Sequence, residues 1–131
     1  MALDLKSIHH VAIICSDYER SKKFYSETLG LAIISENYRA ERSSYKLDLA
    51  IGSGQIELFS FPDAPARVTN PEAQGLRHLA FAVADLEKQV KKLKENGVEV
   101  LPVRIDEYTG KKFAFFFDPD GLPLELYEQI D

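Results

Sequence analysis

The first apolar run of the chain reads Ile8-His9-His10-Val11-Ala12-Ile13, and it is matched further on by Leu76-Arg77-His78-Leu79-Ala80-Phe81. The histidines His10 and His78 are 68 positions apart. Two glutamate segments, Ile56-Glu57-Leu58-Phe59 and Leu124-Glu125-Leu126-Tyr127, match at the same offset of 68. A constant offset without gaps is typical of two similar supersecondary units. The sequence therefore predicts a duplicated module, each copy carrying one histidine and one glutamate.

The first module reads as a strand, a helix and three more strands. The apolar run 8–15 predicts a buried strand. Ser16 followed by Glu19 predicts a capping box that opens a helix, Asp17 is also expected to act as a helix cap, and Gly30 predicts the helix end. Strands are predicted over 31–35, 45–51 and 55–61, with Gly52-Ser53-Gly54 turning the last two into a hairpin.

The second module predicts the same order of elements. Residues 62–75 contain three prolines and predict a linker. A strand over 77–83 precedes a helix that Asp85 caps and that Asn96-Gly97 ends, with one apolar face formed by Leu86, Val90 and Leu93. Strands over 98–104, 112–117 and 122–128 follow, the last two joined by the turn Asp118-Pro119-Asp120-Gly121.

The size and composition of the chain are those of one compact domain. It has 131 residues, of which 45% are hydrophobic and 28% charged. We therefore predict a single domain over 1–131, with module 1 at about 5–61, the linker at 62–75 and module 2 at about 76–131.

The charge balance and the termini exclude several classes of function. A net charge of −5 without a basic cluster disfavours nucleic acid and anionic membranes as partners. No apolar stretch reaches the roughly 18 residues of a membrane span, and residues 1–7 lack the apolar core of a signal peptide. The single Cys15 cannot form an internal disulfide and is predicted to be a small buried side chain. These features predict a cytoplasmic protein whose partner is a small molecule.

The repeated His and Glu form a candidate metal site. Imidazole nitrogen and carboxylate oxygen are ligands that divalent first-row metals accept readily. A single His in an apolar strand is more often a hydrogen-bonded core residue, but a Glu between apolar neighbours needs a partner. Recurrence of both residues at one offset favours a metal site, and preservation by duplication alone remains the competing account. Strand alternation gives a check, because Ala12 and Ile14 should share the face of His10, with His9 on the other face.

The motifs resemble those of the vicinal oxygen chelate superfamily, the glyoxalase, bleomycin-resistance and extradiol-dioxygenase group. The resemblance spans about residues 8–128 and rests on four quoted segments. These are His10-Val11-Ala12-Ile13 with Asp17, Phe24-Tyr25 and Leu29-Gly30-Leu31; His78-Leu79-Ala80-Phe81-Ala82-Val83 with Asp85; Asp118-Pro119-Asp120-Gly121; and Glu125-Leu126.

That resemblance implies an α+β fold in which two βαβββ modules form a cup-shaped mixed sheet around a metal. It places His10, Glu57, His78 and Glu125 at the four ligand positions of one divalent ion, Ni, Co, Zn or Mn, and it implies a homodimer. A carboxylate at the fourth position is similar to glyoxalase I, lactoylglutathione lyase. Two positions differ, because Ile14 and Phe61 stand where that enzyme commonly has an Arg and an Asn. Glutathione is therefore not implied as the thiol.

The leading hypothesis is a metal-dependent lyase or isomerase of the glyoxalase type. Glu57 or Glu125 would move a proton between adjacent carbons as the catalytic base. Apolar walls are predicted from Phe59, Phe81, Phe115 and Tyr127, and an anionic substrate could be held by Arg39, Arg42, Arg67, Lys111 or Lys112. Two alternatives stay open. One is a non-catalytic drug-sequestering module of the bleomycin-resistance type, and the other an Fe(II) extradiol-type dioxygenase that uses only His10, His78 and Glu125.

Overall fold

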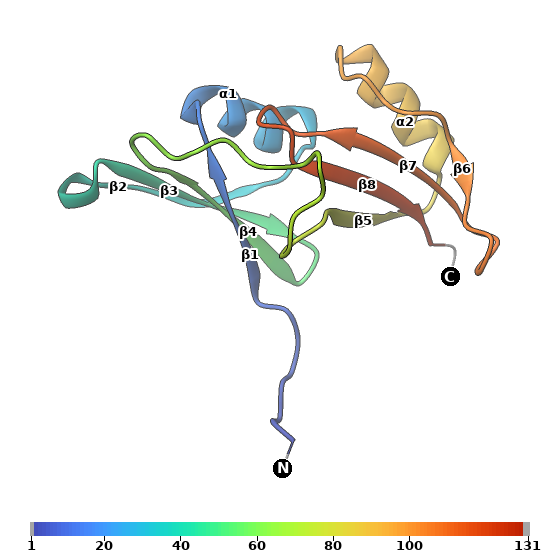
Figure 1. Cartoon of the computed structure of the whole chain (residues 1–131), viewed down its shortest axis with the longest axis horizontal. Helices are drawn as coiled ribbons and strands as arrows, with labels where there is room; N and C mark the ends of the chain where they lie inside the picture. Colours follow the sequence, from blue (N-terminus) through green and yellow to red (C-terminus); the bar gives the residue numbers. More distant parts are fainter. Residues whose placement is uncertain (1, 130–131) are drawn as a thin grey trace. The chain divides into compact units, whose positions relative to one another are not determined.

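The computed structural model describes residues 2–129 and has an α+β fold of two βαβββ modules. Each module forms a four-stranded mixed sheet, with strand orders β1-β4-β3-β2 and β5-β8-β7-β6 (Figure 1). The chain divides into two compact units between Pro65 and Ala66, inside the predicted linker. No helix within residues 2–129 has both the length and the apolar character needed to cross a membrane.

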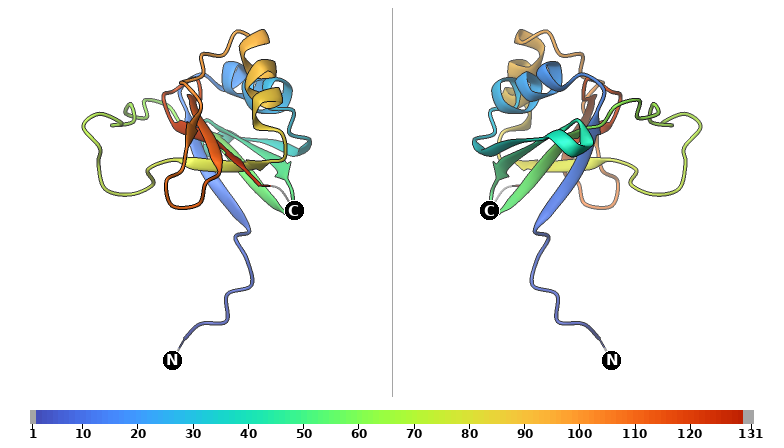
Figure 2. Two further views of the ribbon diagram at one scale, coloured as in Figure 1. Left: turned by 90° about the vertical axis from the view of Figure 1, so that its right-hand side faces the viewer. Right: turned by 90° about the vertical axis from the view of Figure 1, so that its left-hand side faces the viewer.

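The first unit is built on a parallel pair of strands that are distant in sequence. β1 and β4 run parallel, while β4 with β3 and β3 with β2 are antiparallel. The elements are β1 (His10–Cys15), α1 (Tyr18–Lys23), the π-helix η1 (Phe24–Thr28), β2 (Ile33–Arg39), the 3-10 helix η2 (Ala40–Arg42), β3 (Ser44–Ile51) and β4 (Gly54–Ser60). The right view of Figure 2 shows the α1–η1 segment lying over this sheet. β4, at the centre of the pairing, is thus the strand that brings Glu57 next to β1.

Helix α1 is capped by Asp17 and not by Ser16, so the expectation that Asp17 caps a helix is confirmed and the capping box predicted from Ser16 and Glu19 is wrong. The Asp17 carboxylate accepts a hydrogen bond from the Arg20 backbone N–H at 3.1 Å. An N-cap side chain satisfies an N–H three residues on, and the extended backbone of Asp17 suits that position. Asp85 caps α2 in the same way through the N–H of Lys88, as predicted.

The core of the first unit lies on one face of its sheet. Strand side chains alternate, so Ile13 and Cys15 are buried while Ala12 and Ile14 are exposed. Buried strand residues from β3 and β4 join them, and helix residues cover them; these are Leu47, Leu49, Ile56, Leu58, Tyr18 and Tyr25. The alternation predicted for β1 is confirmed, and the face that carries His10 is the more exposed one.

The second unit repeats this arrangement. Its elements are β5 (Leu79–Val83), α2 (Leu86–Glu95), β6 (Arg104–Ile105), β7 (Lys112–Phe117) and β8 (Pro123–Glu128). β5 is parallel to β8, and the other pairs are antiparallel. Helix α2 contacts β7 and β8 and buries its predicted apolar face. The buried hydrophobic residues of this unit are Leu86, Val90, Leu93, Ala114, Phe116, Leu122, Leu124 and Leu126.

Several strand limits differ from the prediction. The strand predicted over 98–104 is regular only at Arg104–Ile105, with one isolated bridge from Val100 to Phe116. Pro102 interrupts it because proline has no N–H for a strand ladder. β2 continues to Arg39, four residues beyond the predicted end at 35, and β1 begins at His10 and not at Ile8.

The turn between β7 and β8 forms as the sequence predicts. One carboxylate oxygen of Asp118 accepts hydrogen bonds from the N–H groups of Asp120 and Leu122, both at 2.9 Å. Gly121 has a φ of +83°, a conformation that residues with a Cβ rarely adopt. This turn directs β8 back along β7 and so places Glu125 on the central strand of the second sheet.

Candidate functional site

His10 and Glu57 come together on neighbouring strands of the first sheet. Glu57 lies directly across from Ala12, so it shares the face of His10. The Nδ1 atom of His10 lies 3.4 Å from a carboxylate oxygen of Glu57. The His10 side chain is 41% exposed and that of Glu57 only 13%. In this pair the imidazole is therefore exposed to solvent, whereas the carboxylate is mostly shielded from it.

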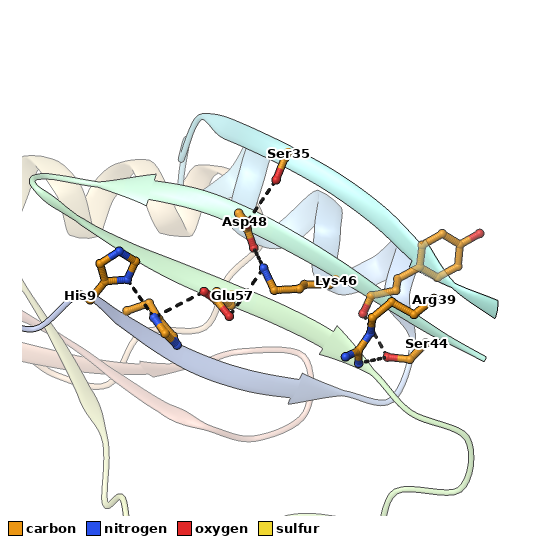
Figure 3. A network of polar contacts seen from close by, with 9 residues as sticks. His9, Ser35, Arg39, Ser44, Lys46, Asp48 and Glu57 are labelled. Atoms are coloured by element: carbon orange, nitrogen blue, oxygen red, sulfur yellow. Dashed lines mark hydrogen bonds and ion pairs between the residues drawn. The ribbon is translucent and has the colours of Figure 1, made fainter. Parts of the chain in front are cut away.

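A second carboxylate and a lysine surround Glu57. Lys46 and Asp48 project from β3, and Asp48 is the cross-strand partner of Glu57. The Lys46 ammonium lies 2.7 Å from Asp48 and 3.8 Å from Glu57, and the Ser35 hydroxyl donates to Asp48 at 3.0 Å. Figure 3 shows these polar groups gathered on one face of the sheet. The lysine offsets the repulsion between two carboxylates that face each other across the strands.

The surroundings of Asp48 change its acidity. Burial acts to raise the pKa of the Asp48 carboxyl, but the hydrogen bonds from Lys46 and Ser35 outweigh it, and the pKa is lowered. Asp48 is thus held as a carboxylate, which keeps Lys46 in place beside Glu57.

His9 does not lie on the opposite side of the strand from His10. Its Nδ1 atom is 3.0 Å from Nδ1 of His10, and the two rings meet edge to face. The prediction from strand alternation fails here because β1 starts at His10, so His9 belongs to the preceding segment. The sequence contains no signal that would have placed the strand's start one residue after His9.

His78 and Glu125 form the corresponding pair in the second unit. The Nε2 atom of His78 lies 3.3 Å from a carboxylate oxygen of Glu125. Glu125 is buried, with 8% of the residue exposed. The rings of His78 and Phe115 pack edge to face, with their centroids 5.0 Å apart. Phe115 is also the cross-strand partner of Glu125, so this pair sits in apolar surroundings.

A cavity of about 290 Å³ opens beside His78 within the second unit. The segment 67–73 forms one side, and strand residues form the other. The lining residues are Arg67, Val68, Thr69, Asn70, Glu72, Ala73, Arg77, His78, Leu101, Arg104, Phe115, Phe117 and Pro123. The lining thus combines three arginines and a histidine with apolar side chains such as Leu101, Phe115 and Phe117.

Three of the four predicted wall residues lie on the faces that carry the glutamates. Phe59 lies on the Glu57 face, and Phe115 and Tyr127 lie on the Glu125 face. Phe81 does not, because it pairs across from the buried Leu126 while Ala80 pairs with Glu125. Its assignment as a wall of the site is wrong, since strand alternation places it on the helix-covered face.

The predicted anion-holding cations have different partners. Lys112 pairs with Glu87 at 2.7 Å. Arg39 donates to the Ser44 hydroxyl and lies over the ring of Phe59, and Arg67 donates to the backbone carbonyls of Leu76 and Arg77. Arg42 is exposed and Lys111 half-buried, and neither lines the cavity. Arg77 and Arg104, which do line it, were missed because nothing in the sequence shows that 67–77 folds back over the sheet.

The donor atoms present suit a divalent metal ion. Each unit brings one imidazole nitrogen and one carboxylate oxygen within 3.3 to 3.4 Å of each other; His10 lies on β1, and His78 directly precedes β5. This nitrogen and oxygen set is one that Ni, Co, Zn and Mn accept. Within neither unit do three or more His, Cys, Asp or Glu side chains of residues 2–129 gather at one point. Each unit by itself therefore brings together only two candidate ligands, one imidazole and one carboxylate.

Comparison with known proteins places the chain among duplicated βαβββ proteins. The uncharacterized protein YwkD of Bacillus subtilis is 67% identical, covering 95% of this chain and 98% of that protein. The uncharacterized protein YaeR of Escherichia coli is 56% identical, with coverages of 97% and 99%. The crystal structure of a glyoxalase family protein from Enterococcus faecalis superimposes with a TM-score of 0.88 at 54% identity, covering 94% of this chain and 98% of that one.

Two more distant relatives have names that state an activity. Metallothiol transferase FosB of Staphylococcus epidermidis is 30% identical, covering 95% of this chain and 83% of that protein. Glyoxylase I 4 of Arabidopsis thaliana is 28% identical, with coverages of 95% and 71%. The model of the Glyoxalase/Bleomycin resistance protein/Dioxygenase superfamily matches residues 7–126. That match spans most of the chain and includes both His–Glu pairs, and the chain belongs to this superfamily, the vicinal oxygen chelate group.

Proposed function

We propose that the protein is a metal-dependent lyase or isomerase of the glyoxalase type, acting on a small substrate with two vicinal oxygens. His10, Glu57, His78 and Glu125 are the proposed ligands of one divalent ion, Ni, Co, Zn or Mn. The observation that carries the proposal is the recurrence of the His–Glu pair, at 3.4 Å in one unit and 3.3 Å in the other, at matching places in the repeat.

The burial of Glu125 supports a cation at this position. A carboxylate that is only 8% exposed loses most of its hydration, and this is costly unless a positive charge compensates it. The one close nitrogen that the second unit offers it, among the described residues, is that of His78. When bound, the metal would act as a Lewis acid toward the substrate's oxygens.

Glu57 is the better placed of the two glutamates to move a proton. One of its carboxylate oxygens faces His10, and the other lies 3.8 Å from the Lys46 ammonium. In the proposed step, the Glu57 carboxylate accepts a proton from the substrate carbon next to a carbonyl, with the Lys46 ammonium beside it. The same group would then return the proton to the adjacent carbon. Glu125 is held beside His78 and Phe115, so its proposed role is that of a fixed ligand.

The first experiment measures bound metal and turnover in the same preparations. Metal per chain is determined in the wild type and in the His10→Ala/His78→Ala double variant after reconstitution with Ni, Co, Zn or Mn. His9→Ala serves as the matched control, because it removes a neighbouring imidazole that is not a proposed ligand. Turnover is assayed with the hemithioacetals that methylglyoxal forms with glutathione and with other thiols. Other thiols are included because Ile14 and Phe61 depart from the glutathione-using pattern.

The expected result is about one metal ion per proposed site in the wild type and in His9→Ala, and loss of metal and turnover in the double variant. A wild type that binds none of these ions after reconstitution would overturn the proposal and favour the drug-sequestering alternative. Oxygen consumption with catechols and Fe(II) would instead favour the dioxygenase alternative.

We also propose that the two units act together as one domain over 1–131 and that the protein is a homodimer. Members of the superfamily bind small molecules, often as dimers, and the second unit contains a cavity of suitable chemistry. Light scattering of the purified chain would show twice the mass of 14.8 kDa if the dimer forms, and a monomer would contradict it.

A further inference from the structure

The cavity of the second unit is proposed here as the binding site of a small oxyanion, with Arg104 as the residue that contacts it. The inference rests on the proposed function, since the anionic group would belong to the same substrate whose oxygens meet the metal. It adds a substrate class, namely a small acid that bears a carboxylate or a phosphate-type group.

The cavity is positively charged in a chain that is acidic overall. Its lining contains Arg67, Arg77 and Arg104 but only one carboxylate, Glu72, while the whole chain has a net charge of −5. Glu72 is paired with Arg77 at 2.5 Å. Two positive charges are therefore left without a carboxylate in the cavity wall, and such a concave basic wall attracts anions.

Among the three arginines of the cavity, Arg104 is the one whose guanidinium N–H groups are available to a ligand. Arg67 uses its guanidinium to hold the backbone carbonyls of Leu76 and Arg77, at 2.7 and 3.1 Å. Arg104 has no carboxylate at ion-pair distance among the residues that the structure describes, and its guanidinium lies 5.2 Å from the ring centre of Phe113. An aromatic ring leaves the N–H groups of an arginine available, and their fork matches the oxygens of a carboxylate or phosphate.

Arg67 is a positioning residue for this site. Its two carbonyl contacts close the segment 67–77 on itself, and its Nε donates to Thr69 at 3.2 Å. The Thr69 hydroxyl in turn donates to the carbonyl of Gly121 in the β7–β8 turn at 3.1 Å. The segment is thereby fixed to the turn that precedes β8, the strand that carries Glu125, and it forms one wall of the cavity.

The size of the cavity limits the ligand. A volume of about 290 Å³ corresponds to roughly ten water molecules at liquid density, so it suits a molecule of a few carbon atoms. His78 lines the same cavity, so an acid bound there reaches a proposed metal ligand. Leu101, Phe117 and Pro123 provide apolar contacts for its carbon atoms.

The test titrates the full-length, metal-stripped chain with inorganic phosphate, with acetate and with choline, and follows amide shifts by NMR. Arg104→Gln is compared with Lys91→Gln, which removes an exposed cation on α2 that does not line the cavity. Both positions are exposed, so neither substitution should unfold the protein.

We expect phosphate or acetate to shift the amides of 67–78 and 101–104, and choline to leave them unchanged. Binding should weaken about tenfold or more in Arg104→Gln and stay unchanged in Lys91→Gln, since a charge-assisted bidentate contact is lost only in the former. The tighter of the two anions identifies the class of acid. Equal binding by Arg104→Gln and the wild type, or shifts with choline as large as with the anions, would overturn the inference.

The outcome is separable from that of the proposed function. Metal binding with no anion binding would reject the oxyanion site and leave the metal site standing. Anion binding in a chain that takes up no divalent ion would do the reverse. In Arg67→Gln the anion should bind more weakly and the amides of 67–77 should shift even without ligand, which a residue acting only through charge would not cause.

Discussion

The two His–Glu pairs keep the same residues but have different neighbours. The residue across the sheet from Glu57 is Asp48, whereas the residue across from Glu125 is Phe115. The first pair has a second carboxylate and Lys46 beside it, and the second pair has an aromatic ring and less solvent. Duplication has thus preserved the proposed ligands while their surroundings diverged, which suggests different tasks for the two glutamates.

The largest expected difference is in metal affinity. Glu125→Ala should weaken divalent-metal binding by about 100-fold or more, because the substitution removes a buried proposed ligand that has no lysine beside it as Glu57 does. Glu57→Ala should weaken it by only about tenfold, because Lys46 already competes for that carboxylate. Calorimetric titration of both variants with Ni or Zn measures the two losses. Equal losses of metal affinity in the two variants would mean that the two glutamates contribute equally to metal binding.

Stability should distinguish the two cross-strand neighbours. Phe115→Ala removes a half-buried ring that contacts His78 and should cost about 2 kcal/mol of unfolding free energy. Asp48→Ala should cost less than about 1 kcal/mol, because Lys46 can then pair with Glu57 alone. Urea unfolding measures both. A larger cost for Asp48→Ala would show that the polar cluster, and not the aromatic contact, supports its sheet.

Replacing Lys46 by methionine should make the first pair a stronger cation binder. Asp48 and Glu57 would then face each other without their shared ammonium, so the metal-free protein should lose about 1 kcal/mol. Divalent-metal affinity should rise several-fold, because the competing charge is gone. The matched control is Lys112→Met, which removes a lysine paired at 2.7 Å with Glu87 on helix α2 and should leave metal affinity unchanged. Unchanged affinity in Lys46→Met would exclude competition for Glu57.

The smallest effect concerns how each helix is attached to its sheet. Helix α2 packs through Leu86, Val90 and Leu93, whereas α1 is also tied by Glu36, which accepts from Tyr18 at 2.5 Å and from Lys22 at 2.8 Å. The hydrogen bonds from Lys22 and Tyr18 lower the pKa of the Glu36 carboxyl below its ordinary 4.5.

A lowered pKa in the folded state stabilises the protein above the unfolded pKa, and this contribution is lost as the pH falls through the folded value. Glu36→Gln should therefore cost less than about 1 kcal/mol at pH 7, since the side chain is 36% exposed. The difference from the wild type should shrink as the pH falls below about 4.5. Thermal unfolding at pH 7 and at pH 3.5 measures it, and a difference that grew with acid would contradict the assignment.

The duplicated order of elements could be predicted from the sequence because the repeat is gapless, and the faces of β1 could be predicted because its burial alternates. Ile13 and Cys15 are buried and Ala12 and Ile14 exposed, as the period of two requires. The sequence predicted that His10, Glu57, His78 and Glu125 converge on one metal ion, which stays a prediction, and the close pairing of one His with one Glu inside each unit is seen only in the structure. The sequence offered both Ser16 and Asp17 as caps of α1, because both are good cap residues, and only the backbone geometry selects Asp17.

The cavity could not be predicted, because it depends on long-range contacts. The segment 67–77 has the composition of an ordinary linker, and its fold is determined by Arg67, Thr69 and the carbonyl of Gly121, 52 positions beyond Thr69. Arg104 stands out only once the irregular strand around Pro102 is known. Neither the fold of segment 67–77 nor the position of Arg104 produces a periodic pattern in the sequence.

The boundary of the two compact units, between Pro65 and Ala66, is a position at which the chain could be cut or its halves exchanged. Each half completes its own hydrogen-bonded sheet, and the segment that walls the cavity lies entirely after the division. A peptide break at this point would cut no strand pairing and remove no cavity wall. The two halves could therefore be encoded in the reverse order, or as two separate polypeptides. Each half would keep the strand pairings of its own sheet.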